Sequence, residues 1–544
     1  MLVPILLSVL SNVVFLDELS PLYRDATPRD GKTSWTSHTA LGLPTGVHVL
    51  GDLPADVPVS LSLVDSDGQP VEGFAVYRLH DVPVEENTGL DSRTEQFKGT
   101  VNPHVIRRAP FRIYEALEPL DLVNGEITME RESAPMAIRV EVEPNRPGTR
   151  DCQLKVTCGE LAYELPWTIH VHDWRPGDDL DFGYTNWFSP TEMAQRHDVT
   201  AWSEEHWPIL AAYAALMDRG GQDTFWMRWS DFFVKDGERW RLESDRLDRY
   251  LRTFFDAGLT RIEGAPIANR PGGDWSKEWL QLRLAKVPAT GEDGQRHLAD
   301  MAGQLRSFMA ERGWENRWIQ HLADEPTDVN AGDYARLSKQ VRELLPGVPI
   351  IEATMTRELV GSVDIWCPQV HRYQENRAFF EERQAAGDEV WTYTCLVPGG
   401  PWLNRLMDQE RLRSVYFAWA AARFGVQGFL HWGLNHYKAD PFQQSVVDHP
   451  AMPGTTNKLP AGDTHVVFPG PGGPWSSTRF EAQRIGMEDL AALRVLQQSD
   501  PERCEALVDR VFRGYDDWEP DVEAYRAVRR DLLRAVAEAE RPTP

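Results

Sequence analysis

The sequence predicts an α/β protein with an all-β N-terminal part: a β-sandwich, a (β/α)8 barrel of the TIM type, and a short C-terminal extension. Two different patterns of apolar residues along the chain predict this. Residues 1–172 alternate apolar and polar side chains between turn clusters, whereas residues 181–455 alternate short apolar runs with segments of helical length. Residues 172–181, "HDWRPGDDLD", resemble a linker, and residues 464–544 form the extension.

The N-terminal part contains period-2 runs such as "VPVSLSLVDS", "MAIRVEVEP" and "YELPWTIHVHD", separated by turn clusters such as "DSDGQP" and "EPNRPGTR". Such strands with frequent Gly, Pro and Asp turns predict an antiparallel sandwich. The first residues, "MLVPILLSVLSNVVF", lack a basic segment and an A-x-A-like cleavage site. We therefore expect a first strand there rather than a signal peptide.

The barrel is predicted from eight short apolar or aromatic runs, which lie at 182–188, 224–230, 261–268, 317–323, 349–355, 362–368, 389–395 and 426–432. Amphipathic segments lie between them, and several end in glycine, the usual helix stop: 204–220, 296–313 and 409–425. Eight βα units over roughly 250 residues fit a (β/α)8 barrel. A doubly wound open sheet is the alternative, although no glycine-rich phosphate motif follows the first strand.

The extension begins with "HVVFPGPGGPWSSTRFEAQRIGMEDLAALRVLQQ", which predicts a strand, a turn and a helix. The remainder is charged and helical. We expect it to complete the barrel or pack against it.

Charge and composition restrict the partners. The net charge of -26 argues against binding to nucleic acid or an anionic membrane. No apolar stretch reaches the length of about 18 residues that a membrane-spanning helix needs. The 20 tryptophans are compatible with core packing and with flat aromatic surfaces for a carbohydrate.

The cysteines predict free thiols. There are five, an odd number, and the nearest two, Cys152 and Cys158, lie in one strand-like run. Six extended residues span about 20 Å, which is too far for a disulfide. Free thiols indicate a reducing compartment, so we expect a cytoplasmic protein.

Two adjacent carboxylates, Asp324 and Glu325, stand where the fourth predicted strand ends, immediately before Pro326. In a (β/α)8 barrel the chemistry is located at the carboxyl ends of the strands. Two close carboxylates raise one another's pKa, which can keep one proton available for general acid catalysis. The alternative is a helix N-cap with a solvated neighbour.

Other polar and aromatic residues fall at the ends of predicted strands or in the loops beyond them, where they could stack on a sugar ring and bond its hydroxyls: Tyr184, Asn186, Tyr393, Trp402, Trp432, Asn435 and His436. For each aromatic residue alone, core packing is the competing interpretation. The sequence has no HExxH motif. His431 and His436 are five residues apart, which places them on different sides of a helix or strand, so they would not share a metal. We expect no metal and no cofactor.

The ordered set "HLADEP", "EVWTYTC", "AWAAARFGVQGFLHWGLNHY" and "VVFPGPGGPWSSTRFEAQRIGMEDLAALRVLQ" resembles the domain of glycoside hydrolase family 123. Upstream, "VVFLDELSPLYRD" and "YEALEPLDL" resemble the sandwich that precedes that barrel. The resemblance implies a retaining enzyme that acts on terminal β-linked N-acetylgalactosamine, an amino sugar at the end of a glycan or glycoconjugate.

The resemblance also implies roles for residues. Glu325 is the general acid/base, and Asp324 holds the 2-acetamido group, whose carbonyl oxygen attacks the anomeric carbon. Tyr393 hydrogen-bonds the acetamido oxygen, and Trp432 forms the floor of the sugar site. His321 departs from the aromatic or apolar residue expected at its position.

Two alternatives remain open. One is a retaining glycosidase for a sugar without an acetamido group, with Glu263 or Glu352 as a separate nucleophile about 5 Å away. The other is a non-catalytic carbohydrate-binding protein of the same fold. The sequence assigns no oligomeric state.

Overall fold

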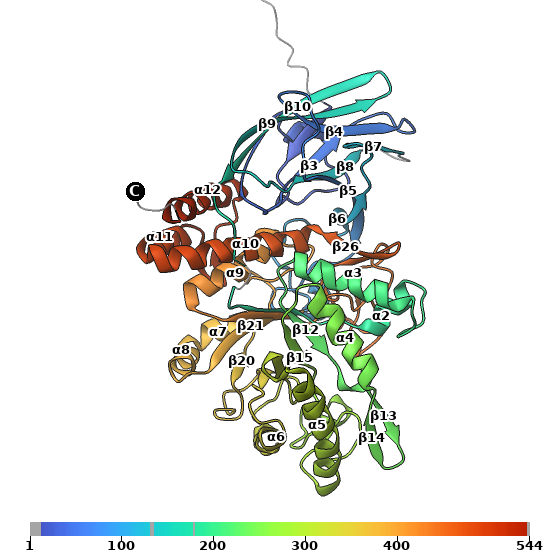
Figure 1. Cartoon of the computed structure of the whole chain (residues 1–544), viewed down its shortest axis with the longest axis vertical. Coiled ribbons are helices and arrows are strands. Elements are labelled where there is room, and N and C mark those ends of the chain that lie inside the picture. Colours follow the sequence, from blue (N-terminus) through green and yellow to red (C-terminus); the bar gives the residue numbers. More distant parts are fainter. Residues whose placement is uncertain (1–11, 131–134, 178–179, 541–544) are drawn as a thin grey trace, which may run out of the picture.

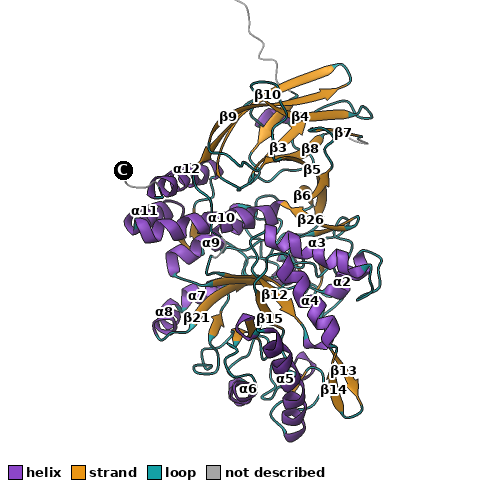
Figure 2. Ribbon diagram, in the orientation of Figure 1, coloured by secondary structure: helices purple, strands orange, loops and turns teal. Residues whose placement is uncertain are grey.

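The computed structural model describes residues 12–130, 135–177 and 180–540. Residues 1–11, which carry most of the apolar segment expected to form a first strand, lie outside these ranges; strand β1 begins at Val13. A β-rich N-terminal part lies above a mixed part in which helices surround parallel strands, and the C-terminal helices lie between them on one side (Figures 1 and 2).

Two sheets form the N-terminal part, as the alternating pattern predicts. The first has the order β1 (Val13–Leu16), β3 (Thr45–Gly51), β8 (Met136–Val142), β5 (Phe74–Val84), β6 (Phe111–Leu120), β26 (Gly473–Ser477) and β25 (Phe468–Gly470). The second has the order β2 (Trp35–Ala40), β10 (Leu161–His172), β9 (Gly148–Cys158), β4 (Val59–Asp65) and β7 (Glu126–Met129). Apolar side chains of both sheets, including Val140 and Trp167, form one buried cluster.

The eight predicted strand positions of the second part all contain strands. They are β11 (Gly183–Asn186), β12 (Thr224–Met227), β15 (Arg261–Gly264), β18 (Trp318–Gln320), β19 (Ile351–Ala353), β20 (Ile365–Cys367), β21 (Glu389–Thr394) and β22 (Gly428–His431). Parallel pairing gives the sheets β11-β22-β21-β20-β19 and β12-β15-β18.

The two parallel sheets meet at two seams. A single parallel bridge between Gln320 and Ile350 joins β18 to β19. At the other seam, between β11 and β12, the described residues form no strand ladder; instead the Tyr184 amide donates to Asp223 Oδ1 at 2.7 Å. The described strands thus form a half-barrel sheet of five strands and a separate sheet of three, which does not confirm the predicted closed barrel.

Helices follow most of these strands: α2 (Pro190–Arg196), α3 (His206–Arg219), α4 (Ser244–Asp256), α5 (Glu292–Arg312), α6 (Ala331–Leu344), α7 (Val370–Glu375), α8 (Arg377–Ala385) and α9 (Leu412–Phe424). The connection from β19 to β20, residues 354–364, consists of bends and turns. Eight complete βα units were therefore one too many, because this connection is too short for a crossover helix. Smaller strands lie in the loops: β13 (Phe233–Asp236), β14 (Arg239–Leu242), β16 (Ala268–Asn269), β17 (Gln281–Leu282), β23 (Val447–Asp448) and β24 (Lys458–Leu459).

The C-terminal extension contacts both parts. Helix α10 (Thr478–Ser499) packs along α9, while β26 pairs with β6 of the first sandwich sheet. After α11 (Pro501–Val511), β27 (Phe512–Gly514) and β28 (Asp517–Trp518), helix α12 (Val522–Ala539) lies on β2 and β10. At the junction Glu115 of β6 accepts hydrogen bonds from Arg411 Nη2, at 2.8 Å, and from Arg479 Nε. Burial raises the pKa of Glu115, but the two arginines outweigh it and lower the pKa to about 2.

All five cysteines are buried and free, which confirms the prediction from their number and spacing. Within the described ranges, none of the helices combines the length and the apolar character that a membrane crossing requires.

Candidate active site

The acidic pair follows β18 at the carboxyl edge of the parallel strands. The backbone of Glu325 has φ +51°, a left-handed conformation that is uncommon for a residue other than glycine. Arg270, on the loop after β15, fixes this turn: its Nη1 donates to the carbonyl oxygens of Asp324 at 3.0 Å and Glu325 at 2.6 Å. Pro326 also disfavours a helical continuation at Glu325. The local sequence therefore ends the strand in a strained turn, a feature that clusters at functional sites.

The carboxyl group of Glu325 is largely shielded from water and hydrogen-bonded. Its Oε1 accepts a hydrogen bond from the Tyr393 hydroxyl at 2.7 Å. Burial, and then the charge of Asp324, raise the pKa of Glu325 to about 7, while the Tyr393 hydrogen bond and Arg270 act in the opposite direction. A carboxyl with a pKa near neutrality holds its proton at working pH and can also release it, as a general acid/base must.

Replacing Tyr393 by Phe should raise the pKa of Glu325 further. In the wild type the Tyr393 hydroxyl stabilises the ionised carboxylate of Glu325, so loss of this hydroxyl favours the protonated form. A ¹³C NMR titration of glutamate-labelled protein should show the midpoint of Glu325 moving to higher pH. Tyr184→Phe is the matched control, because the Tyr184 hydroxyl is buried without a hydrogen-bond partner in the described structure. A midpoint that falls in Tyr393→Phe would contradict this assignment.

A cavity of about 340 Å³ opens beside the pair, with Asp324 in its wall. Trp187 and Trp226 stack in the lining at a centroid distance of 4.1 Å, and Trp432 stacks on His436 at 5.2 Å. The cavity is lined by Trp187, Trp226, Arg228, Trp229, Ser230, Ala265, Pro266, Ile267, Arg283, Leu284, Met301, Asp324, Trp432 and His436. Aromatic faces with a few polar groups are the composition of a small-molecule site.

Trp432 is held from behind by a buried carboxyl. Its Nε1 donates to Asp463 Oδ1 at 2.9 Å, and burial raises the pKa of Asp463 to about 7. The hydrogen bond fixes the orientation of the indole plane at the cavity wall. Asp463 lies 31 residues after Trp432 in the chain, so no local pattern of the sequence indicates this partner.

A carboxylate–imidazolium–carboxylate triad lies beneath the site. His321 Nε2 contacts Glu263 Oε1 at 2.8 Å, and its Nδ1 contacts Glu352 Oε1 at 3.0 Å; all three side chains are fully buried. Burial lowers the pKa of His321, but the two carboxylates outweigh it and raise the pKa to about 10. The two partners therefore favour the protonated imidazole, while burial raises the pKa of Glu352, and these contacts account for a polar residue at a position where an apolar one was expected.

Every carboxylate oxygen of this triad is already bonded. Glu263 accepts from Trp187 Nε1 at 2.9 Å and from Thr185 Oγ1 at 2.6 Å. Glu352 Oε2 accepts from the amides of Leu322 and Ala323 at 3.0 and 2.9 Å, and from Tyr334. The triad thus anchors both the backbone leading to Asp324 and the cavity-lining residue Trp187.

Four of the residues predicted for the site lie elsewhere. Tyr184 packs against Phe429 on the outer side of β11, and Asn186 bonds Gln222 and Arg405. The alternate residues of this strand, Thr185 and Trp187, reach the site instead, so the assigned alternation was displaced by one residue. Asn435 is fully buried, with its amide on the backbone of Ser189.

Trp402 packs edge-on to His371 at 5.9 Å and is not part of the cavity wall. Asp324, Trp432 and His436 line the cavity, whereas Glu325 and Tyr393, which are hydrogen-bonded to each other, lie next to Asp324 but outside the lining. The other lining residues were missed, among them Trp187, Trp226, Arg228 and Arg283, although the aromatic run "TFWMRWS" was a usable signal for Trp226 and Arg228.

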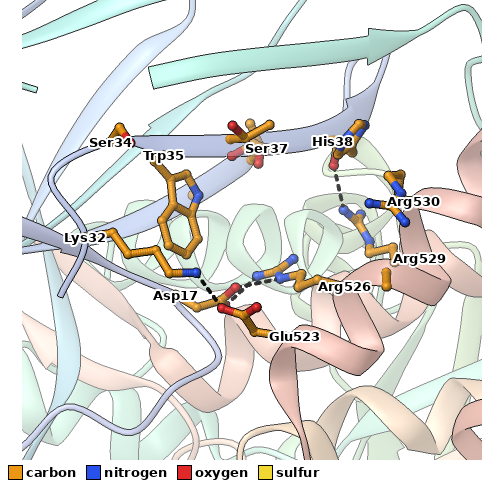
Figure 3. A pocket seen from close by; sticks show the side chains of 14 residues that line it. Asp17, Lys32, Ser34, Trp35, Ser37, His38, Glu523, Arg526, Arg529 and Arg530 are labelled. Carbon is orange, nitrogen blue, oxygen red and sulfur yellow. Dashed lines mark hydrogen bonds and ion pairs between the residues drawn. The ribbon is translucent and has the colours of Figure 1, made fainter. Parts of the chain in front are cut away.

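Another cavity, of about 500 Å³, lies between β2 and α12, away from the acidic pair (Figure 3). Both of its acidic side chains are paired with basic ones: Lys32 pairs with Glu523, and Arg526 Nη2 pairs with Asp17 Oδ1 at 2.8 Å. Arg529 donates to the carbonyl oxygen of His38 at 3.2 Å. These pairs join the extension to the sandwich, so we place the catalytic candidate in the smaller cavity.

The family model "Glycoside hydrolase 123, catalytic domain" matches residues 187–496, more than half of the chain. The chain belongs to glycoside hydrolase family 123. The match begins at Trp187 and includes the acidic pair, the cavity-lining strands and helix α10. Membership supports glycosidase activity on a carbohydrate substrate.

The fold of a family 123 glycoside hydrolase from Clostridium perfringens agrees with this assignment. That structure is 13% identical, has a TM-score of 0.69, and the alignment covers 97% of this chain and 96% of the other. An endo-β-1,4-mannanase from Thermotoga petrophila is much less similar, with 10% identity and a TM-score of 0.36 over 57% of this chain and 76% of its own. A comparison with curated proteins found no match.

Proposed function

We propose that this family 123 protein is a retaining exo-β-N-acetylgalactosaminidase-like enzyme with a substrate-assisted mechanism. The observation that carries the proposal is the acidic pair itself. Asp324 lies in the wall of a tryptophan-lined cavity, and its neighbour Glu325 has a pKa of about 7. The C. perfringens relative, whose structural analysis addressed glycolipid glycan hydrolysis, is consistent with a glycan substrate.

In the proposed first step the acetamido carbonyl oxygen of the substrate attacks the anomeric carbon. The glycosidic bond breaks, and the Glu325 proton passes to the departing oxygen. Asp324 accepts the acetamido N–H and stabilises the positive charge of the resulting oxazolinium ion. Water then attacks the anomeric carbon and gives its proton to the Glu325 carboxylate, which restores the acetamido group with retained configuration.

The state of Glu263 and Glu352 favours this mechanism over a protein nucleophile. Both side chains are 0% exposed, and their oxygens are occupied by His321 and by backbone or side-chain donors. A nucleophile must reach the anomeric carbon, and neither carboxylate reaches the cavity surface. The glycosidase for a sugar without an acetamido group would need a different carboxylate.

Within this proposal, Trp432 forms the floor of the sugar site, Tyr393 orients the acid and the acetamido oxygen, and His436 borders the pocket. We further propose that the eight strands make up one barrel of the (β/α)8 type over 181–455, in which the connection from β19 to β20 lacks its helix, with a sandwich over 1–172 and an extension over 464–544. The free cysteines support a cytoplasmic location.

A thiazoline analogue of N-acetylgalactosamine tests the mechanism. It should inhibit strongly, because it resembles the bicyclic intermediate and such analogues bind about 10²- to 10⁸-fold more tightly than substrates. Asp324→Asn should weaken the thiazoline more than it weakens galactose, since Asp324 is proposed to contact the acetamido group. Inhibition constants for both ligands in both proteins provide the comparison.

Two results would reject substrate assistance. One is indifference of the enzyme to the thiazoline. The other is a covalent adduct of a 2-fluoro sugar on any carboxylate, detected by mass spectrometry of the intact protein. Glu343→Gln, on the helix α6 face remote from the cavity lining, serves as a matched carboxylate control and should leave both inhibition constants unchanged.

A further inference from the structure

The charge of the active-site cavity is opposite to that of the whole protein. The chain carries 83 acidic and 57 basic side chains, yet the cavity wall contains two arginines, Arg228 and Arg283, and one acid, Asp324. His436 adds no positive charge at neutral pH, because burial lowers its pKa. The wall therefore has one more basic than acidic side chain, whereas the chain as a whole has an excess of acidic ones.

Arg283 is the unusual member of this wall. Its Nε donates to the carbonyl oxygen of Ala268 at 3.2 Å. Among the residues that the structure describes, no carboxylate oxygen lies within 4.0 Å of its guanidinium nitrogens, so Arg283 makes no ion pair there. The side chain is exposed within the lining, directly after β17. Most of its guanidinium donors are thus available to a ligand.

Two other arginines reinforce this position. Arg228 binds Asp231 through Nε at 2.9 Å, which leaves its other nitrogens at the wall. Arg270 uses Nη1 for the carbonyl oxygens of the acidic pair and stacks on Trp275 at 3.8 Å. Its positive charge acts on both Glu325 and Arg283, so Arg270 adds positive charge near Arg283 although it does not line the cavity.

We propose that the natural substrate carries an anionic group, a sulfate ester or a carboxylate, which Arg283 binds. This rests on the proposed function and specifies its substrate class. A planar guanidinium binds such oxygens with two parallel hydrogen bonds, a geometry that a neutral hydroxyl cannot match. An anion would also pair with a guanidinium that makes no ion pair among the described residues, where only the more distant charges of Asp324 and Glu352 act on it.

The test compares hydrolysis of matched substrates. The first set is 4-nitrophenyl N-acetyl-β-galactosaminide with its 4- and 6-sulfates, and the second is N-acetylgalactosamine β-linked to glucuronic acid or to glucose. The wild type should prefer an anionic member by about 10- to 100-fold in kcat/KM, the range for a hydrogen bond to a charged group. Preference within the first set identifies a sulfate ester, and preference within the second identifies a carboxylate.

Arg283→Gln should abolish this preference, and Arg283→Lys should retain only part of it, because lysine keeps the charge without the paired donors. Lys286→Gln is the matched control: it removes one positive charge from the same loop, but Lys286 is exposed and outside the cavity lining. It should keep the full preference.

Two results would overturn the proposal. One is a wild type with no preference for any anionic substrate. The other is a kcat/KM that falls equally for all substrates in Arg283→Gln, which would mean that Arg283 binds neutral hydroxyls. If the wild type hydrolyses none of them, the proposed function has failed separately. Calorimetric binding of N-acetylgalactosamine and its 6-sulfate, and of glucuronic acid and glucose, then still decides the role of Arg283. Equal affinities within both pairs, or no binding, would reject it.

Discussion

Glu325→Gln should lower kcat/KM by about 10²- to 10⁴-fold on glycosides whose leaving group is a sugar, the range that general acid catalysis contributes. Glutamine keeps the size of the side chain and can accept the Tyr393 hydrogen bond, but it has no proton to give. A 2,4-dinitrophenyl leaving group needs little protonation, so its cleavage step should lose less. Steady-state kinetics with both substrates measure the difference.

The pH profile provides an independent check on the same residue. The acid must be protonated, so wild-type activity on sugar leaving groups should fall as pH rises through about 7, the pKa that burial and Asp324 give Glu325. The variant should lack this limb. Equal losses for both leaving groups, or an unchanged limb in Glu325→Gln, would remove Glu325 from the acid role.

His321→Leu should reduce the free energy of unfolding by about 3–5 kcal/mol, the cost of removing one partner from a buried ion pair. Glu263 and Glu352 would be left without their shared cation in a site with no exposure. The anchoring of the backbone before Asp324 should weaken as well, so activity should fall in the protein that remains folded. Urea denaturation gives the stability change.

His48→Leu is the matched control for this variant. His48 is also buried, but neither ring nitrogen has a hydrogen-bond partner in the described structure, and burial lowers its pKa to about 4, so it is neutral. Replacing it should cost far less or stabilise the fold. If both histidine variants lose equal stability, the triad has no special ionic role.

The positions of the parallel strands could be predicted from the sequence because each is a short, continuous apolar run bounded by turn residues. Which side chains of β11 point toward the site could not be predicted. The run "FGYTNWF" has aromatic residues at both odd and even positions, so periodicity alone could not decide between Tyr184 and Trp187. The hydrogen bonds of Thr185 and Trp187 to Glu263, on another strand, decide it.

Longer-range features were beyond local patterns. The position of Asp324 and Glu325 at a strand end follows from counting strands, and their place beside a cavity agrees with that count. Arg283 belongs to a loop with no motif, and Asp463 reaches Trp432 only through the fold. Alternation also gave no indication that β26 would join β6, because this pairing connects distant parts of the chain.

The pairing of β26 with β6 also affects how the chain is made. Synthesis proceeds from the N-terminus at about 5–20 residues per second, so the stretch of β6 around Ala116 and Leu117 waits on the order of tens of seconds before Ser476 and Ser477 exist. During that time its backbone groups are open to pairing with strands of other chains. The sandwich is therefore an incomplete folding unit on the ribosome, and its last interior strand arrives only when nearly the whole protein has been translated.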